Sequence, residues 1–188
     1  MRDYRKILHS TIFANVTSPT VSKPVQSFTH EQEKALKEAL DNPNYRVKNK
    51  EEIKVVYYLG LYTGQRLKDC VLLRWSKVNL AQKKIECKQF KTGKEVTIPI
   101  APQLVSVLED ALTWKTDDYG YVCPKVAERY NTADAQGKNI GSGLVNIDVL
   151  RVLKWIGLKT SVKVEGRSRA ITVFGFTHYA TVAMSCWR

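Results

Sequence analysis

The spacing of apolar and polar positions predicts that order begins near residue 29, with an amphipathic helix over 31–40. Apolar residues three and four positions apart lie on one face of such a helix and point into a core. These positions are Ala35, Leu36, Ala39 and Leu40. Thr29 followed three residues later by Gln32 is typical of a capping box at the helix start, and Asp-Asn-Pro at 41–43 ends the helix.

Two further helices are predicted, over about 49–62 and 66–74, with the break Thr63-Gly64 between them. The second would carry Arg66, and Trp75 and Val78 after it would enter the core. The inward positions of the first are Ile53, Val56, Tyr57, Gly60 and Leu61.

After residue 80 the period changes to that of strands. Residues 84–89 and 95–100 alternate roughly between apolar and polar, and Gly93 in the intervening Lys91-Thr-Gly-Lys94 is a hairpin signal. Pro102 is expected to open a helix over 103–112. The glycine-rich stretch 113–142 is interpreted as loops, 146–155 as a helix closed by Gly157, and 159–174 as another hairpin or an extended arm.

Residues 1–27 show little periodicity, and the run from Asn15 to Pro24 holds two prolines and several hydroxyl residues. This composition is typical of a linker, which suggests that a domain once preceded it. The chain has neither an internal repeat nor a low-complexity tract.

Charge changes the picture most, because thirty Lys and Arg against eighteen Asp and Glu give a formal net charge of +12. A domain this basic favours a polyanionic partner, most often nucleic acid, although a solvated basic surface or contact with anionic lipid would give the same total. The cations gather around the predicted hairpin (Lys83, Lys84, Lys88, Lys94) and along the late arm (Lys159, Lys163, Arg167, Arg169). Lys88, Lys94, Arg167 and Arg169 are the predicted DNA contacts; for any single one of them, solubility is the simpler role.

The cysteines argue against a zinc protein and against a disulfide-stabilised protein. Cys70, Cys87, Cys123 and Cys186 form no C-x-x-C pair and have no histidine at ligand spacing, so neither a zinc site nor a disulfide framework is expected. No apolar run approaches the roughly 20 residues that span a bilayer, and the start lacks a secretory signal. We therefore expect a cytoplasmic protein with reduced thiols, no metal, no cofactor and no membrane contact.

The candidate chemistry lies in Tyr62-Thr-Gly-Gln-Arg66-Leu-Lys-Asp69. Arg66 follows a glycine break at a predicted helix start, and Asp69 one turn later could hold its guanidinium. A guanidinium fixed in this way offers two parallel donors to a phosphodiester. A surface Arg–Asp pair at a helix start explains the same residues without any function.

The wider run from Leu61 to Trp75 resembles the first conserved box of the tyrosine recombinases (phage-integrase family), with Thr-Gly-x-Arg, an acidic residue three positions on, then leucine and tryptophan. Residues 88–100, with Lys91-Thr-Gly-Lys94 and Ile98-Pro99-Ile100, resemble the family's lysine-bearing hairpin. The resemblance covers about 28–176. It implies a mainly α-helical α+β fold with a small antiparallel sheet, of the DNA breaking–rejoining type, and it makes 1–27 a linker from a missing N-terminal DNA-clamping domain.

The resemblance also implies a reaction. A tyrosine hydroxyl would attack a phosphodiester to give a phosphotyrosyl intermediate, without a metal. Arg66 would stabilise the charge on the phosphoryl oxygens, Asp69 would support it from behind, and Lys91 would protonate the leaving oxygen. The intact enzyme would perform DNA integration or recombination as a tetramer on double-stranded DNA.

The pattern breaks where the second box, His-x-Leu-Arg, should follow Phe176. The chain reads Thr177-His178-Tyr179-Ala180-Thr181, with no arginine three residues after His178 and no tyrosine beyond Tyr179. Removing the first base of CAC TCA TTA CGC CAC, which encodes His-Ser-Leu-Arg-His, yields Thr-His-Tyr-Ala-Thr. A single-base frameshift is therefore our hypothesis for the aberrant tail 177–188, and a diverged C-terminus is the alternative.

Three interpretations remain open. The first is a DNA-binding, catalytically inactive fragment of a recombinase, expected to be monomeric because the sequence lacks the C-terminal element that recombinases of this family exchange between protomers. The second is a non-enzymatic DNA-binding or decoy protein in which the broken site is the working form. The third is a basic interaction protein without a DNA role, for which substitution of Arg66 and Lys91 would change no binding property.

Overall fold

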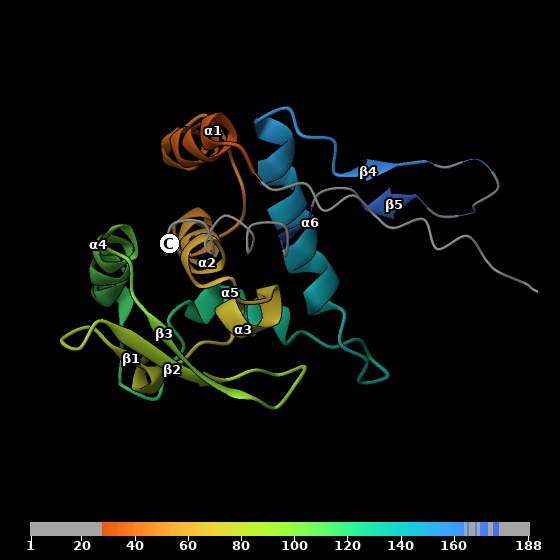
Figure 1. Cartoon of the computed structure of the whole chain (residues 1–188). Helices are drawn as coiled ribbons and strands as arrows, with labels where there is room; N and C mark the ends of the chain where they lie inside the picture. Colours follow the sequence, from red (N-terminus) through yellow and green to blue (C-terminus); the bar gives the residue numbers. More distant parts are fainter. Residues whose placement is uncertain (1–27, 164, 166–167, 169, 173–174, 177–188) are drawn as a thin grey trace, which may run out of the picture.

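The computed structural model describes residues 28–163, 165, 168, 170–172 and 175–176. Three long helices, α1 (His30–Asp41), α2 (Lys50–Thr63) and α6 (Gly141–Trp155), form one part of it, and a small sheet lies on the other side of α2 (Figure 1). Helix α1 packs on α6, and α2 packs against α3, α4 and α5. Helix α2 is thus the central element of the fold.

The predicted start of α1 is confirmed. The Thr29 hydroxyl accepts a hydrogen bond of 3.3 Å from the Gln32 N–H, and the Thr29 N–H donates to the Gln32 side chain at 3.0 Å. The predicted end of α2 is confirmed as well, because Gly64 adopts a left-handed conformation (φ 67°) and caps the helix. An L-residue with a side chain is strained at such an angle, so the glycine sets this boundary.

Helix α3 (Leu67–Val71) is shorter than the predicted 66–74, and this prediction was wrong at its C-terminal end. The chain leaves the helix because Arg74 pairs with Tyr121 in an isolated β-bridge and the Trp75 N–H donates to the Gly120 carbonyl at 3.0 Å. A short 3-10 turn, η2 (Trp75–Lys77), follows, and Trp75 is buried as expected. The pairing of residues 74–75 with residues 120–121 thus ends the helix before Arg74.

The sheet has the antiparallel order β1-β2-β3, with β1 (Val78–Asn79), β2 (Lys84–Lys88) and β3 (Glu95–Pro99). Ile85 faces Ile98 across the predicted hairpin, and Gly93 takes the left-handed conformation in its turn (φ 66°). The mainly helical fold with a small antiparallel sheet is therefore confirmed.

Helix α4 (Pro102–Ala111), followed by the 3-10 turn η3 (Leu112–Trp114), begins at Pro102 as predicted. The interpretation of 113–142 as loops was wrong in two places. Helix α5 (Pro124–Tyr130) lies within it, and α6 begins at Gly141 rather than 146. Gly141 packs so tightly that an added Cβ would lie 2.0 Å from the Arg129 carbonyl oxygen. This glycine allows close helix packing, which the sequence alone does not distinguish from a loop glycine.

The late arm forms a second, two-stranded hairpin, β4 (Ser161–Val162) with β5 (Ile171–Thr172), beyond α6 (Figure 1). The chain then returns to α2, where Phe176 is buried with its ring centroid 6.0 Å from that of Tyr57. An added Cβ on Gly60 would lie 2.3 Å from this ring. Gly60 therefore leaves the space that Phe176 fills.

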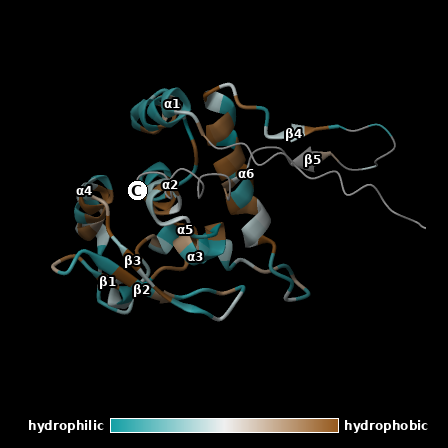
Figure 2. Ribbon diagram, in the orientation of Figure 1, coloured by the Kyte–Doolittle hydropathy of each residue, from teal (hydrophilic) through white to brown (hydrophobic). Residues whose placement is uncertain are grey.

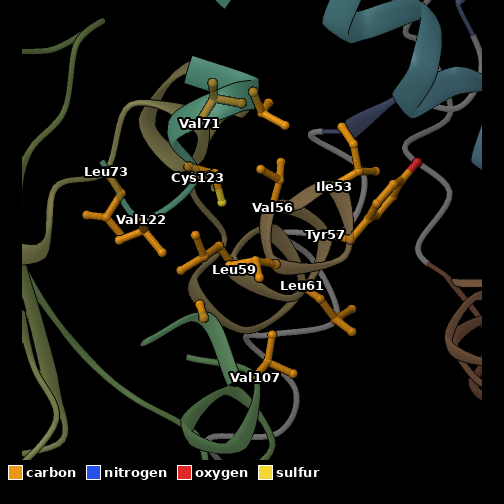
Figure 3. Close-up of a cluster of buried hydrophobic side chains, with 14 of the residues drawn as sticks. Ile53, Val56, Tyr57, Leu59, Leu61, Val71, Leu73, Val107, Val122 and Cys123 are labelled. Atoms are coloured by element: carbon orange, nitrogen blue, oxygen red, sulfur yellow. The ribbon is translucent and has the colours of Figure 1, made fainter. Parts of the chain in front are cut away.

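The hydrophobic core surrounds α2. Side chains of α2 such as Val56 and Leu59 meet Val71, Val107 and Val122 from three other segments (Figure 3). The helices differ in their share of apolar residues: α1 is mostly hydrophilic, whereas α6 alternates between hydrophobic and hydrophilic stretches (Figure 2). This agrees with α1 covering one side of the fold while α6 contributes Val145, Val149, Val152 and Leu153 to the interior.

Candidate nucleic-acid interface

Arg66 lies at the junction between α2 and α3. Its backbone is extended (φ −73°, ψ 158°), and it is the residue that precedes the first turn of α3. The side chain is half-buried. Within the described part of the chain, its guanidinium makes no hydrogen bond and no ion pair. The fold thus sets the backbone position of Arg66, and within the described residues the donors of its guanidinium are available to a ligand.

Asp69 is buried, with 7% of its surface exposed, and it contacts the β2–β3 hairpin. Its Oδ1 atom accepts a hydrogen bond of 2.8 Å from the Phe90 N–H, whereas Oδ2 has no partner among the described residues. The described ion pairs within 4 Å do not include Arg66 with Asp69. The spacing argument for direct pairing assumed that both residues were helical, but Arg66 is extended.

A second hydrogen bond joins the same two segments. The Gln89 side-chain amide donates to the Gln65 side-chain oxygen at 2.9 Å, and Thr92 donates to Gln89 at 2.8 Å. Gln65 and Asp69 flank Arg66 in the sequence, while Gln89 and Phe90 directly precede Lys91. The hairpin is therefore docked on the Arg66 segment at two points, both directly before Lys91 in the sequence.

The buried Asp69 carboxylate contributes to the raised pKa of two neighbouring cysteine thiols. Burial first, and then the negative charge of Asp69, raise the pKa of the Cys70 thiol well above its ordinary value, and the same two causes raise the pKa of Cys87. Both thiols are consequently protonated near neutral pH, which makes them poor nucleophiles. Among the described residues, no three His, Cys, Asp or Glu side chains gather in a way that would hold a metal ion.

The other predicted DNA contacts divide into two groups. Lys88 and Lys94 are exposed on the β2–β3 hairpin, and Lys159 and Lys163 are exposed next to β4. Lys84, by contrast, pairs with Glu86 at 2.7 Å. Arg167, Arg169, His178 and Tyr179 lie outside the described residues.

Sequence reasoning missed one cation, Arg74. Its guanidinium donates to the Tyr119 carbonyl at 2.6 Å and to the Tyr121 hydroxyl at 3.3 Å, and it lies 4.6 Å from the centre of the Tyr121 ring. The exposed guanidinium is thus held from two directions. The Leu-Arg-Trp run contains the residue, but its partners lie 45 and 47 positions away, beyond the reach of local pattern analysis.

Comparison with known proteins identifies the family and the fold. Residues 26–140 match the phage integrase family, and the chain belongs to this family of site-specific tyrosine recombinases. No curated protein matches the sequence with significance. In the described residues, no helix is long and apolar enough to cross a membrane.

Three solved structures share the fold. The lambda integrase catalytic core aligns with a TM-score of 0.52 at 17% identity, over 86% of this chain and 82% of that one. XerA recombinase aligns at 0.53 and 16% identity, over 86% and 49% of the two chains. XerH recombinase, bound to a palindromic difH substrate after cleavage, aligns at 0.55 and 14% identity, over 86% and 42%. The chain therefore spans most of an isolated catalytic core but only about half of XerA.

Proposed function

We propose that this chain binds duplex DNA through the Arg66 segment and the β2–β3 hairpin, and that it does not cut the DNA. The observation that carries the proposal is the double attachment of the hairpin, Gln89 to Gln65 and Phe90 to Asp69. It supports a site in which Arg66 and Lys91 approach one phosphate together. An arginine fork contributes two directed donors and a lysine a flexible one, a combination suited to a phosphodiester.

Asp69 has a positioning role in this proposal. Its Oδ1 atom holds the backbone of Phe90, one residue before Lys91. The carboxylate would thus fix the hairpin that carries the lysine, instead of clamping Arg66. Lys88 and Lys94, exposed on either side of the hairpin turn, would contact phosphates farther along the duplex, as would Arg167 and Arg169 on the late arm.

The proposed absence of cleavage rests on the sequence, read with the family's chemistry. Strand exchange needs a tyrosine nucleophile and a second arginine, and the chain has neither a tyrosine beyond Tyr179 nor an arginine three residues after His178. In this proposal, 28–176 is an incomplete catalytic domain, 1–27 a linker and 177–188 an aberrant tail.

The expected assembly differs from that of the relatives. Lambda integrase has been solved as a dimer bound to a core site and as a tetramer bound to a Holliday junction. We propose that this chain binds DNA as a monomer, and that a tetramer requires an intact enzyme.

The test is DNA binding across a salt series, with a nicked suicide substrate that traps covalent complexes. We expect affinity to fall steeply with salt, because cations that contact phosphates displace counterions from the duplex. Arg66→Ala should weaken binding, and Arg46→Ala is the matched control, since Arg46 is exposed on the α1–α2 loop. No binding at low salt would overturn the proposal, and a covalent adduct would overturn its inactive part.

A second candidate is that the non-cutting form is the working protein, a DNA-binding decoy derived from an integrase. The missing nucleophile favours it. Sequencing the gene from codon 177 through and past the last codon separates the two. A shifted reading frame that encodes His-x-Leu-Arg and a later tyrosine would identify a frameshifted recombinase, whereas unrelated DNA would favour the decoy.

A further inference from the structure

A pocket of about 420 Å³ lies between the 69–77 segment and the β2–β3 hairpin. Its volume falls within the roughly 300–1,000 Å³ of typical small-molecule sites. The wall is mostly apolar and includes Leu72, Leu73 and Phe90. Three cations, Arg74, Lys77 and Lys88, also line it, and within the described part of the chain no carboxylate lies within 4 Å of any of the three. Asp69 lines the pocket as well, with its Oδ1 atom accepting the hydrogen bond from the Phe90 N–H, so the pocket combines an apolar wall with three cations and one carboxylate.

Phe90 provides an aromatic surface in this pocket. The residue is 54% exposed, and it forms part of the pocket wall. The Lys68 ammonium lies 4.4 Å from the ring centre, but Lys68 does not line the pocket, so the pocket side of the ring is open. The hydrogen bond from the Phe90 N–H to Asp69 fixes the backbone beneath the ring. The backbone that carries the ring is thus fixed at the edge of the pocket.

Arg74 provides a fixed cation at the same pocket. The Tyr119 carbonyl and the Tyr121 hydroxyl occupy two of its five donors, which leaves three free. Because the Tyr121 ring already supports the guanidinium, little side-chain entropy is lost when an anion binds.

We propose that this pocket accepts one unpaired nucleotide of a DNA strand, with its base against Phe90 and its phosphate near Arg74, Lys77 and Lys88. The ligand must carry an aromatic or apolar ring and a negative charge, and a nucleotide carries both. Base stacking on aromatic side chains combined with a cationic border is how proteins hold single-stranded DNA without reading its sequence. The proposal deepens the proposed DNA-binding function and rests on it.

An acidic peptide also pairs negative charge with apolar side chains, but the chain's position in a DNA-recombining family and its net charge of +12 favour DNA. An unpaired nucleotide is available without the energy needed to flip a base out of a duplex. A bulged duplex is therefore the ligand that tests the site most directly.

The experiment compares binding of a fully paired duplex with binding of the same duplex carrying one unpaired 2-aminopurine nucleotide. The wild-type protein should prefer the bulged duplex by at least about fivefold, the lower end of one stacking contact, and should quench the 2-aminopurine emission. Phe90→Ala should abolish both effects; because Phe90 belongs to the DNA-binding hairpin, the quantity measured is the ratio of bulged-duplex to paired-duplex affinity, which should fall to about one in this variant. Phe90→Tyr should retain both, because its ring still stacks. Ile147→Ala is the matched control, since Ile147 is also 54% exposed but lies on α6.

The outcomes separate this proposal from the one on which it rests. If the wild-type protein binds paired DNA but shows no preference for the bulge, or if the preference survives Phe90→Ala, the pocket assignment is wrong and duplex binding stands. If neither DNA is bound, the proposed function itself fails. Competition by an acidic peptide or a free mononucleotide, without a bulge preference, would assign the pocket to a different ligand and overturn the proposal.

Discussion

The side-chain amide of Gln89 donates a hydrogen bond of 2.9 Å to the side-chain oxygen of Gln65, across 24 positions of sequence. The proposed phosphate-binding pair is close to these two residues in the sequence: Arg66 is next to Gln65, and Lys91 is two positions after Gln89. The bond therefore couples the position of the hairpin to that of the arginine. We expect this bond to matter more for the position of the hairpin than for the free energy of unfolding.

Replacing Gln89 with Leu should weaken duplex binding while leaving the fold intact. One hydrogen bond between partly buried polar groups contributes about 1 kcal/mol, so the free energy of unfolding should fall by no more than that. The hairpin amides around Lys91 should exchange faster in hydrogen-exchange measurements, and duplex affinity should fall about three- to tenfold. Gln103→Leu is the matched control because Gln103 is exposed at the start of α4. Equal effects of the two variants would contradict the coupling.

Replacing Gly60 with Ala should destabilise the protein, because the new methyl group would lie 2.3 Å from the Phe176 ring. Overpacking of this kind costs about 1–3 kcal/mol, to be measured by urea unfolding. The cost should disappear in a Phe176→Ala background, where the ring is gone.

Gly143→Ala is the control for that experiment. Gly143 also lies in a helix, and an added Cβ would meet nothing within 4 Å. This variant should gain up to about 1 kcal/mol from helix propensity. An equally stable Gly60→Ala protein would show that Phe176 does not occupy the space over α2.

The sequence predicted those parts of the fold whose signals are local. The capping box of Thr29 and Gln32, the glycine that ends α2 and the glycine in the hairpin turn each act within a few residues, and all three are confirmed. Helix α5 escaped prediction because a distant residue stabilises its start. The Glu52 carboxylate accepts the backbone N–H groups of Lys125 and Val126, at 3.2 and 2.8 Å, from more than 70 positions away.

In the candidate site, too, local motifs were predictable and long-range contacts were not. A motif at 61–75 and a hairpin at 88–100 were recognisable as separate units, and each predicted which cation to examine. How the two units meet was not predictable. Asp69 was expected to bind Arg66 three positions away, yet it binds Phe90 at a separation of 21. The conformation of Arg66 itself decides this, and it depends on the left-handed turn at Gly64 just before it.

Replacing Asp148 should lower the free energy of unfolding more than replacing its exposed partner Arg151. It is buried on α6 and pairs with Arg129 of α5, while Arg151 donates to its other oxygen at 3.5 Å. Asp148→Ala leaves the partly buried Arg129 unpaired and should cost about 3 kcal/mol in urea unfolding. Arg151→Ala, which removes a half-exposed partner, should cost less than about 1 kcal/mol. Similar losses for the two variants would mean that the Arg129 pair is not the dominant one.

Glu52 should make stability depend on pH in the direction opposite to that of a salt-bridged carboxylate. Burial raises the pKa of its carboxyl above the ordinary 4.5, only partly offset by the hydrogen bonds from Val126 and Lys125. A carboxyl with a raised pKa binds its proton more tightly in the folded state. Its contribution to stability is therefore fully present below pH 4.5 and is lost as the pH rises through the folded-state pKa.

Comparison of the wild-type protein with Glu52→Gln isolates this contribution, because Gln cannot titrate. The free energy of unfolding of the wild-type protein, measured relative to that of the variant, should decrease as pH rises from 4.5 through the raised pKa and then become constant. Glu51→Gln, the same charge change at the exposed neighbouring position, is the matched control. An increase across that window would mean that the hydrogen bonds to α5 outweigh burial, and that the ionised carboxylate is the form that holds α5 in place.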